Sequence, residues 1–105
     1  MTTQFRKGVI EMCILALIER KDTYGYEIVG EIAKRAAINE GTVYPILRRL
    51  TGENYFQTYL VESTGGPARK YYSITPLGRQ YLEQQKREWT AFSQMVDEIL
   101  RGDNA

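Results

Sequence analysis

The sequence predicts a mainly α-helical fold with one small β-hairpin, and two observations carry this prediction. Apolar residues recur at helical spacing over four separate stretches of the chain. Between the third and the fourth of these stretches, apolar and polar residues alternate instead, on both sides of a glycine pair, as in a hairpin. The chain has 105 residues and is 43% apolar, which suits one folded body with a modest core.

The first predicted helix covers about residues 8–20 and is apolar on nearly every side, and its apolar run from Val9 to Ile18 is interrupted only by Glu11. Because a bilayer span needs about 20 apolar residues, this run is too short to cross a membrane. A helix that is apolar all round must be buried all round, and one small domain covers only one face. We therefore expect a second subunit to cover the other face, which places these residues of the first helix in a dimer interface: Val9, Cys13 and Leu17.

The next two stretches predict two helices joined by a short turn. Asp22 and Thr23 are candidates to cap the first of them, which ends near Arg35. After the turn 36–38, Asn39 is a good N-cap for a helix that runs to about Thr51. Two helices joined by a turn of this length are typical of a helix-turn-helix.

The second helix of this pair has two distinct faces. Its core face is predicted to hold the apolar residues Val43, Ile46, Leu47 and Leu50. Its outward face is small in the first half and cationic in the second: Gly41, Thr42, Pro45, Arg48 and Arg49. Such a face can approach a nucleic-acid backbone closely and offer charge to phosphate. An ordinary surface helix with two exposed arginines would show the same pattern.

A hairpin follows directly, with strands predicted at residues 55–61 and 69–74 and a glycine-rich tip over residues 62–68. A hairpin in this place is a wing, so the predicted fold is a winged helix-turn-helix. The return strand begins with Arg69 and Lys70, which would lie near a phosphate backbone if the preceding helix occupied a major groove. The alternative is an exposed hairpin with solubilising charges.

The charge distribution agrees with such a surface. The net charge is only +1, but residues 34–80 carry seven basic and three acidic residues, whereas both flanks are slightly acidic. A local basic stripe is the usual footprint of a phosphate-binding surface. Chance clustering on a solvated face would give the same count.

The last predicted helix starts at Thr75 and Pro76 and ends at Gly102, and it divides the chain into a DNA-binding domain, 1–75, and a dimerisation helix, 76–105. Two series of residues spaced by seven predict a short coiled-coil seam with a second subunit. The first series is Leu82, Trp89 and Val96, and the second is Gln85, Phe92 and Ile99.

Three motifs resemble the PadR-like family of bacterial transcriptional regulators. They are YGYEI at residues 24–28, NEGTVYPILRRL at 39–50 and GPARKYYSITPLG at 66–78. The resemblance covers about residues 8–100 and is closest to the short subfamily with one C-terminal helix. One departure is that Asn54 stands where the family usually has a glycine.

The resemblance implies a homodimer that inserts its third helix into the major groove of a palindromic double-stranded operator, usually to repress. With the outward and wing residues above, it implies this DNA-binding set: Tyr24, Asn39, Gly41, Thr42, Tyr44, Pro45, Arg48, Arg49, Gly66, Arg69 and Lys70. Some short members bind flat hydrophobic ligands between subunits with aromatic residues of the last helix. Trp89 stands at a matching place and Phe92 lies one turn further on, although an aromatic pair at seam spacing also suits simple packing of the dimer core.

Other functions fit the sequence less well. The chain has no histidine and a single cysteine, Cys13, which lies within the apolar run, so we expect no catalytic nucleophile with a base, no metal site and no cofactor. The lone cysteine suits a reducing cytoplasm. A winged helix that binds proteins instead of DNA is the main alternative, but the outward arginines and basic wing suit DNA better than an apolar protein interface does.

Overall fold

The first helix, α1, covers Thr3–Arg20 and packs one face against the rest of the chain. The computed structural model describes residues 3–102, and side chains from residue 8 onward. Ile14 and Leu15 are fully buried, whereas Cys13 is exposed. The rest of the chain covers only one face of α1, and Cys13 lies on the face that it leaves open, where the sequence predicts a dimer interface.

The expected cap of the second helix was wrong. Thr23–Tyr24 form a short strand, β1, which pairs with Tyr72 and Tyr71, so α2 begins only at Gly25 and covers Gly25–Ala33. Tyr24 occupies the N-cap position, and its side chain makes no capping hydrogen bond. The strand pairing therefore sets the start of α2, in place of a local cap.

The third helix, α3, covers Glu40–Gly52 and confirms the predicted start. The Oδ1 atom of Asn39 accepts a hydrogen bond from the Gly41 N–H at 2.9 Å. The predicted core face is buried, and Pro45 lies exposed inside the helix. A proline here removes the hydrogen bond to the carbonyl of Gly41. Because Gly41 is also exposed, solvent can satisfy that carbonyl.

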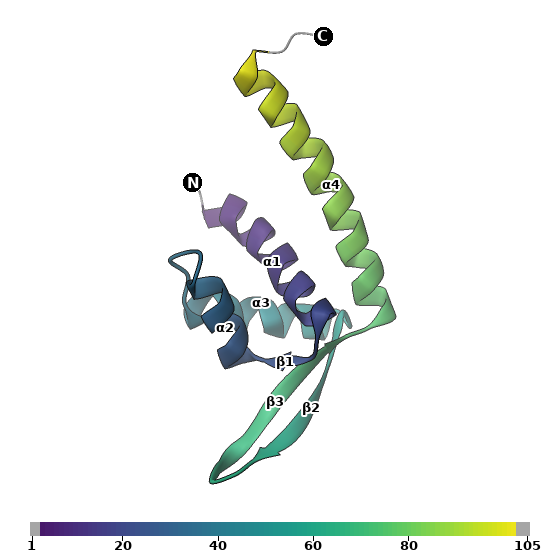
Figure 1. Ribbon diagram of the computed structural model, residues 1–105. Coiled ribbons are helices and arrows are strands. Elements are labelled where there is room, and N and C mark those ends of the chain that lie inside the picture. The colour runs from purple at the N-terminus through teal and green to yellow at the C-terminus, as the bar shows by residue number, and fades with distance from the viewer. Residues whose placement is uncertain (1–2, 103–105) are drawn as a thin grey trace.

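The wing consists of β2, Phe56–Ser63, and β3, Gly66–Ile74, joined by the two-residue turn Thr64-Gly65. Both strands are longer than predicted because the turn is tight, with Gly65 at φ 76°. The sheet is antiparallel with the order β1-β3-β2. Only its base enters the core, through Phe56, Tyr72 and Ile74, and the rest of the hairpin projects from the body (Figure 1).

The last helix, α4, covers Pro76–Arg101 and is capped as predicted at both ends. The Thr75 hydroxyl accepts from the Gly78 N–H at 3.0 Å, and Gly102 ends the helix with φ 77°. At 26 residues, α4 is about 39 Å long, and its C-terminal half rises away from the body (Figure 1). Within the described residues, no helix combines the length and apolarity that crossing a membrane requires.

Leu82 corrects the predicted seam. Its side chain is 0% exposed and belongs to the core of its own chain, because the first turns of α4 pack against α1. The large apolar residues that remain exposed on α4 are Leu77 in its first turn and, further along the helix, Trp89, Phe92, Met95, Ile99 and Leu100.

Candidate nucleic-acid interface

Three basic side chains from two elements gather on one face of the molecule. Arg48 of α3 and Arg69 and Lys70 of β3 line a shared hollow of about 450 Å³. We call these three residues the cationic surface. The hollow is otherwise lined mainly by aromatic and small residues of β1, α2, α3 and β3: Tyr24, Gly25, Tyr26, Tyr44, Thr51 and Tyr72.

Tyrosines hold the two wing cations in place. The guanidinium of Arg69 lies over the ring of Tyr24, 4.6 Å from its centroid, and donates to the Tyr24 hydroxyl at 3.3 Å. The ammonium of Lys70 lies 5.9 Å from the centroid of the Tyr72 ring. An aromatic face attracts a cation without cancelling its charge, so both side chains are oriented and stay positive.

Tyr44 and Gly25 bring α3 close to the start of α2. A Cβ atom at Gly25 would overlap the phenol ring of Tyr44, so only glycine leaves that ring where it is. Burial raises the pKa of the neighbouring Tyr72; Tyr44 raises it further, whereas Arg48 lowers it. Tyr44, Arg48 and Tyr72 all line the hollow.

The pairing of charges explains why the basic surplus collects on this surface. Of the seven basic residues between Lys34 and Gln80, four form ion pairs: Lys34, Arg35, Arg49 and Arg79. Arg48, Arg69 and Lys70 form none with any carboxylate in the described part of the chain. The three unpaired cations are thus the ones that line the hollow.

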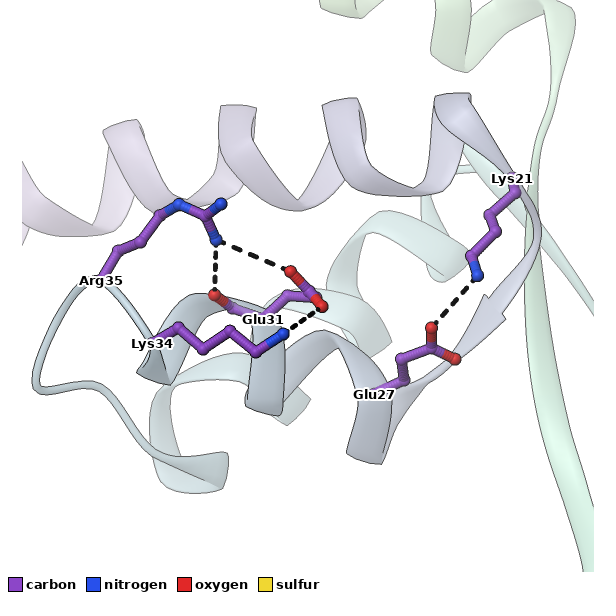
Figure 2. Close-up of polar contacts among 5 residues, drawn as sticks. All are labelled: Lys21, Glu27, Glu31, Lys34 and Arg35. Atoms are coloured by element: carbon purple, nitrogen blue, oxygen red, sulfur yellow. Dashed lines mark hydrogen bonds and ion pairs between the residues drawn. The ribbon is translucent and has the colours of Figure 1, made fainter.

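Figure 2 shows how the face of α2 beside α1 is neutralised. Lys34 donates to the Glu31 carboxylate at 2.9 Å, and Arg35 lies 3.6 Å from its other oxygen. The hydrogen bond from Lys34 is the main reason why the pKa of Glu31 is lowered. Lys21, directly after the end of α1, pairs with Glu27 of α2 at 3.3 Å. The cations of this face therefore have acidic partners, unlike those of the cationic surface.

Arg49 does not belong to the cationic surface, although the sequence placed it beside Arg48. Its Nη2 donates to Glu11 Oε2 of α1 at 2.6 Å, and its Nη1 lies 3.5 Å from Glu53. The hydrogen bond to Glu11 is the largest cause of the raised pKa of Arg49. The arginine points toward α1 because it lies at the border of the apolar face of α3, next to Leu50.

The remaining predicted DNA-binding residues are spread along α3 and the wing. Gly41 and Pro45 are exposed on the first half of α3, and Thr42 is half-buried between them. The Oδ1 atom of Asn39 is occupied as the cap. Gly66 lies at the wing tip, where it pairs with Ser63, and it is not among the residues that line the hollow.

The predicted dimer and ligand residues form a second group on α1 and α4. Val9, Gln85, Trp89 and Phe92 line a hollow of about 270 Å³ together with Gly8, Met12 and Glu88. Cys13 and Ile99 are exposed, and Leu17 and Val96 are partly buried. The Oε1 atom of Gln85 is buried and has no hydrogen-bond partner among the described residues.

Sequence reasoning missed two features of the site. One is β1, which is too short to show a period and places Tyr24 beside Tyr71, with ring centroids 5.3 Å apart. The other is the partner of Arg49. Glu11 gave a signal, because it is the one charged residue in an otherwise apolar run, but the sequence did not say what it pairs with.

Comparison with known proteins identifies the family. The model of the transcriptional regulator PadR-like family matches residues 14–84. The PadR-like transcriptional regulator of Bacillus cereus is 39% identical, with a TM-score of 0.85, over 96% of this chain and all of that one. A PadR family transcription regulator of Clostridium difficile is 36% identical, with a TM-score of 0.78, over 87% and 97% of the two chains.

A relative of similar length is the transcriptional regulator Rv3488 of Mycobacterium tuberculosis. It is 26% identical over 102 residues, which are 96% of this chain and 92% of that protein. Proteins of the matched family are transcriptional regulators and not enzymes. The family match covers well over half of the chain, and the winged helix-turn-helix with its long last helix agrees with it. The chain therefore belongs to the PadR-like family of transcriptional regulators.

Proposed function

We propose that this regulator binds double-stranded DNA sequence-specifically as a homodimer and represses transcription. The observation that carries the proposal is the cationic surface, where α3 and the wing bring together three cations that no described carboxylate neutralises. Phosphate contacts of this kind position a protein on a duplex, and side chains that reach base edges provide specificity. The exposed first half of α3 leaves room for such an approach.

In the proposed complex, α3 lies in the major groove and the wing follows the backbone. Thr42, Tyr44 and Pro45 face the bases, and Arg48 reaches either a base edge or a phosphate. Arg69 and Lys70 contact phosphates from positions that their tyrosine neighbours hold ready. Arg49 is left out of this set, since its guanidinium is engaged with Glu11.

The exposed apolar residues of α4 support the dimer. Trp89 and Phe92 are 40% and 49% exposed in the single chain, and they lie on the same helix as Ile99 and Leu100, which are more exposed still. Association with a second copy through α1 and α4 would remove this apolar surface from water. The hollow between the two helices is then the place where a small hydrophobic ligand would enter and release the operator.

Fluorescence anisotropy tests the proposal with duplex DNA from upstream of the regulator's own gene against a scrambled duplex, across a salt series. We expect binding to the upstream duplex to persist at salt that removes the scrambled one. Arg48→Ala should weaken specific binding by about 1–3 kcal/mol if Arg48 reads a base. Arg87→Ala removes the same charge from an exposed position on α4 and should leave affinity unchanged.

Other outcomes would change the proposal. An equal loss on both duplexes in Arg48→Ala would make Arg48 a phosphate contact. Equal binding of the wild type to both duplexes, lost together as salt rises, would refute sequence-specific binding. That result would favour a winged helix that binds another protein.

A further inference from the structure

One buried carboxylate joins three helices. Glu11 of α1 is 7% exposed, and each of its oxygens accepts a hydrogen bond from a different helix. Oε2 accepts from Arg49 of α3 at 2.6 Å, and Oε1 accepts from the Tyr81 hydroxyl of α4 at 2.9 Å. We call Glu11, Arg49 and Tyr81 the buried triad, after its buried member Glu11; the other two residues are partly buried. No other carboxylate in the described residues bridges α3 and α4 in this way.

The α4 end of the buried triad is held rigidly. The ring of Tyr81 stacks on that of Tyr55, with centroids 4.3 Å apart and planes 4° from parallel. The Tyr55 carbonyl accepts the Thr75 N–H at 3.0 Å, immediately before α4 begins. Tyr55 itself follows the end of α3, so the ring stack ties the start of α4 to the exit of α3.

The buried triad lies between the two surfaces that the proposed function uses. Arg49 adjoins Arg48, and consecutive helix residues point about 100° apart, so holding Arg49 at Glu11 fixes the direction of Arg48. Along α4, Tyr81 lies eight residues before Trp89, which is about 12 Å of helix. Any tilt of α4 that moves the Tyr81 hydroxyl must therefore also move the carboxylate that holds α3.

We infer that Glu11, Arg49 and Tyr81 are positioning residues that set the rotation of α3 relative to α4, and so couple the dimer helices to the cationic surface. This inference rests on the proposed function, because it assigns a role in DNA affinity to side chains that contact no DNA. Partial burial strengthens the argument, since the Glu11 side chain is only 9% exposed and partly buried charge pairs are screened less than the more exposed pairs of α2. Coupling also needs a contiguous physical connection between the two sites, which these contacts supply.

A purely structural role for the buried triad makes a different prediction. If the contacts only hold the fold together, weakening one of them lowers the unfolding temperature and leaves the affinity of the folded dimer as it was. If they position α3, affinity falls even where the protein is fully folded. The two roles are therefore separated by measuring DNA affinity well below the unfolding transition.

Two variants weaken the buried triad gently. Tyr81→Phe removes one hydroxyl and leaves the ring stack, and Glu11→Gln removes the charge that Arg49 needs. Glu19→Gln is the matched control, because Glu19 also lies on α1 and contacts α4 through Arg79 and Lys86 but does not reach α3. All three are compared with the wild type for upstream-duplex affinity, salt dependence and dimer content, and Arg48→Ala marks loss of a direct contact.

We expect Tyr81→Phe and Glu11→Gln to bind the upstream duplex about 2- to 30-fold more weakly, as dimers, whereas Glu19→Gln binds as the wild type does. The salt slope should not change, because the same cations still contact phosphate. Wild-type affinity in both variants, with a loss in Arg48→Ala, would overturn the inference and leave the proposed function standing.

Amide hydrogen exchange of α3 covers the case in which the wild type shows no preference for the upstream duplex and the proposed function fails. Faster exchange across α3 in Tyr81→Phe, but not in Glu19→Gln, would still support the positioning of α3 by the buried triad. Unchanged exchange would overturn it.

Discussion

Leu82 tests whether the base of α4 belongs to the core of its own chain. Its side chain is fully buried beside α1, so Leu82→Ala leaves a cavity as well as losing apolar burial. Substitutions of this kind cost about 2.7–5.0 kcal/mol, depending on how far the site can collapse. Here collapse of the cavity is limited, because two hydrogen bonds hold the start of α4 in place. The Thr75 N–H donates to the Tyr55 carbonyl, and the Gly78 N–H donates to the Thr75 hydroxyl. We therefore expect a loss of about 3–5 kcal/mol in the free energy of unfolding.

Urea unfolding followed by circular dichroism, at one fixed protein concentration, measures this loss. With a slope of about 1.5 kcal/mol per molar, 3 kcal/mol shifts the midpoint by about 2 M. Leu77→Ala, at a half-exposed position in the first turn of α4, should change stability by no more than about 0.5 kcal/mol. Leu82→Met keeps the volume and should cost less than about 1.5 kcal/mol.

A different result would assign Leu82 to the seam between subunits. If Leu82→Ala costs less than about 1 kcal/mol and instead separates the subunits in sedimentation, Leu82 is a seam residue, and assigning it to the monomer core is a mistake. If the wild-type chain is a monomer at every concentration, the midpoint shift alone decides the question.

Two further predictions concern the same end of α4. Gly78→Ala should destabilise the protein by about 1–3 kcal/mol in thermal unfolding, because its Cβ would overlap the Tyr55 carbonyl, whereas Gly30→Ala, in open space on α2, should be neutral or stabilising by up to about 1 kcal/mol. Burial, and then the hydrogen bond to Glu11, raise the pKa of Tyr81 well above its ordinary value, which favours the protonated phenol in the folded state. The resulting stability is fully present below about pH 10 and is lost as the pH rises above it, so urea titrations above pH 10 should show a steeper fall for the wild type than for Tyr81→Phe. A parallel fall in both proteins would contradict this assignment.

Local chemistry made much of the fold predictable. Asn39, Thr75 and Gly102 act at the helix ends where the sequence placed them, because a cap involves only neighbouring residues. The helical spacing of the apolar residues in α3 likewise predicted which side of that helix is buried. Arg48 could be placed on the outward side for the same reason.

Contacts between distant parts of the chain could not be predicted in the same way. Periodicity left Arg49 at the border of the apolar face, and only the fold shows that Glu11, 38 residues earlier, draws it toward α1. Leu82 has the spacing of a seam residue, but the docking of α4 on α1 buries it within its own chain. The strand β1 depends wholly on pairing with β3, since its two residues carry no pattern of their own.

The division of cations into paired and unpaired sets also affects how the molecule is oriented as it approaches a charged partner. The whole molecule is 60 Å long, and the wing with its unpaired cations projects in the direction away from the C-terminal half of α4 (Figure 1). That half of α4 carries Asp97 and Glu98 and one cation, Arg101. The net charge of +1 therefore conceals an electric dipole. A polyanion exerts a torque on such a body, so the wing turns toward it during approach without any large excess of positive charge.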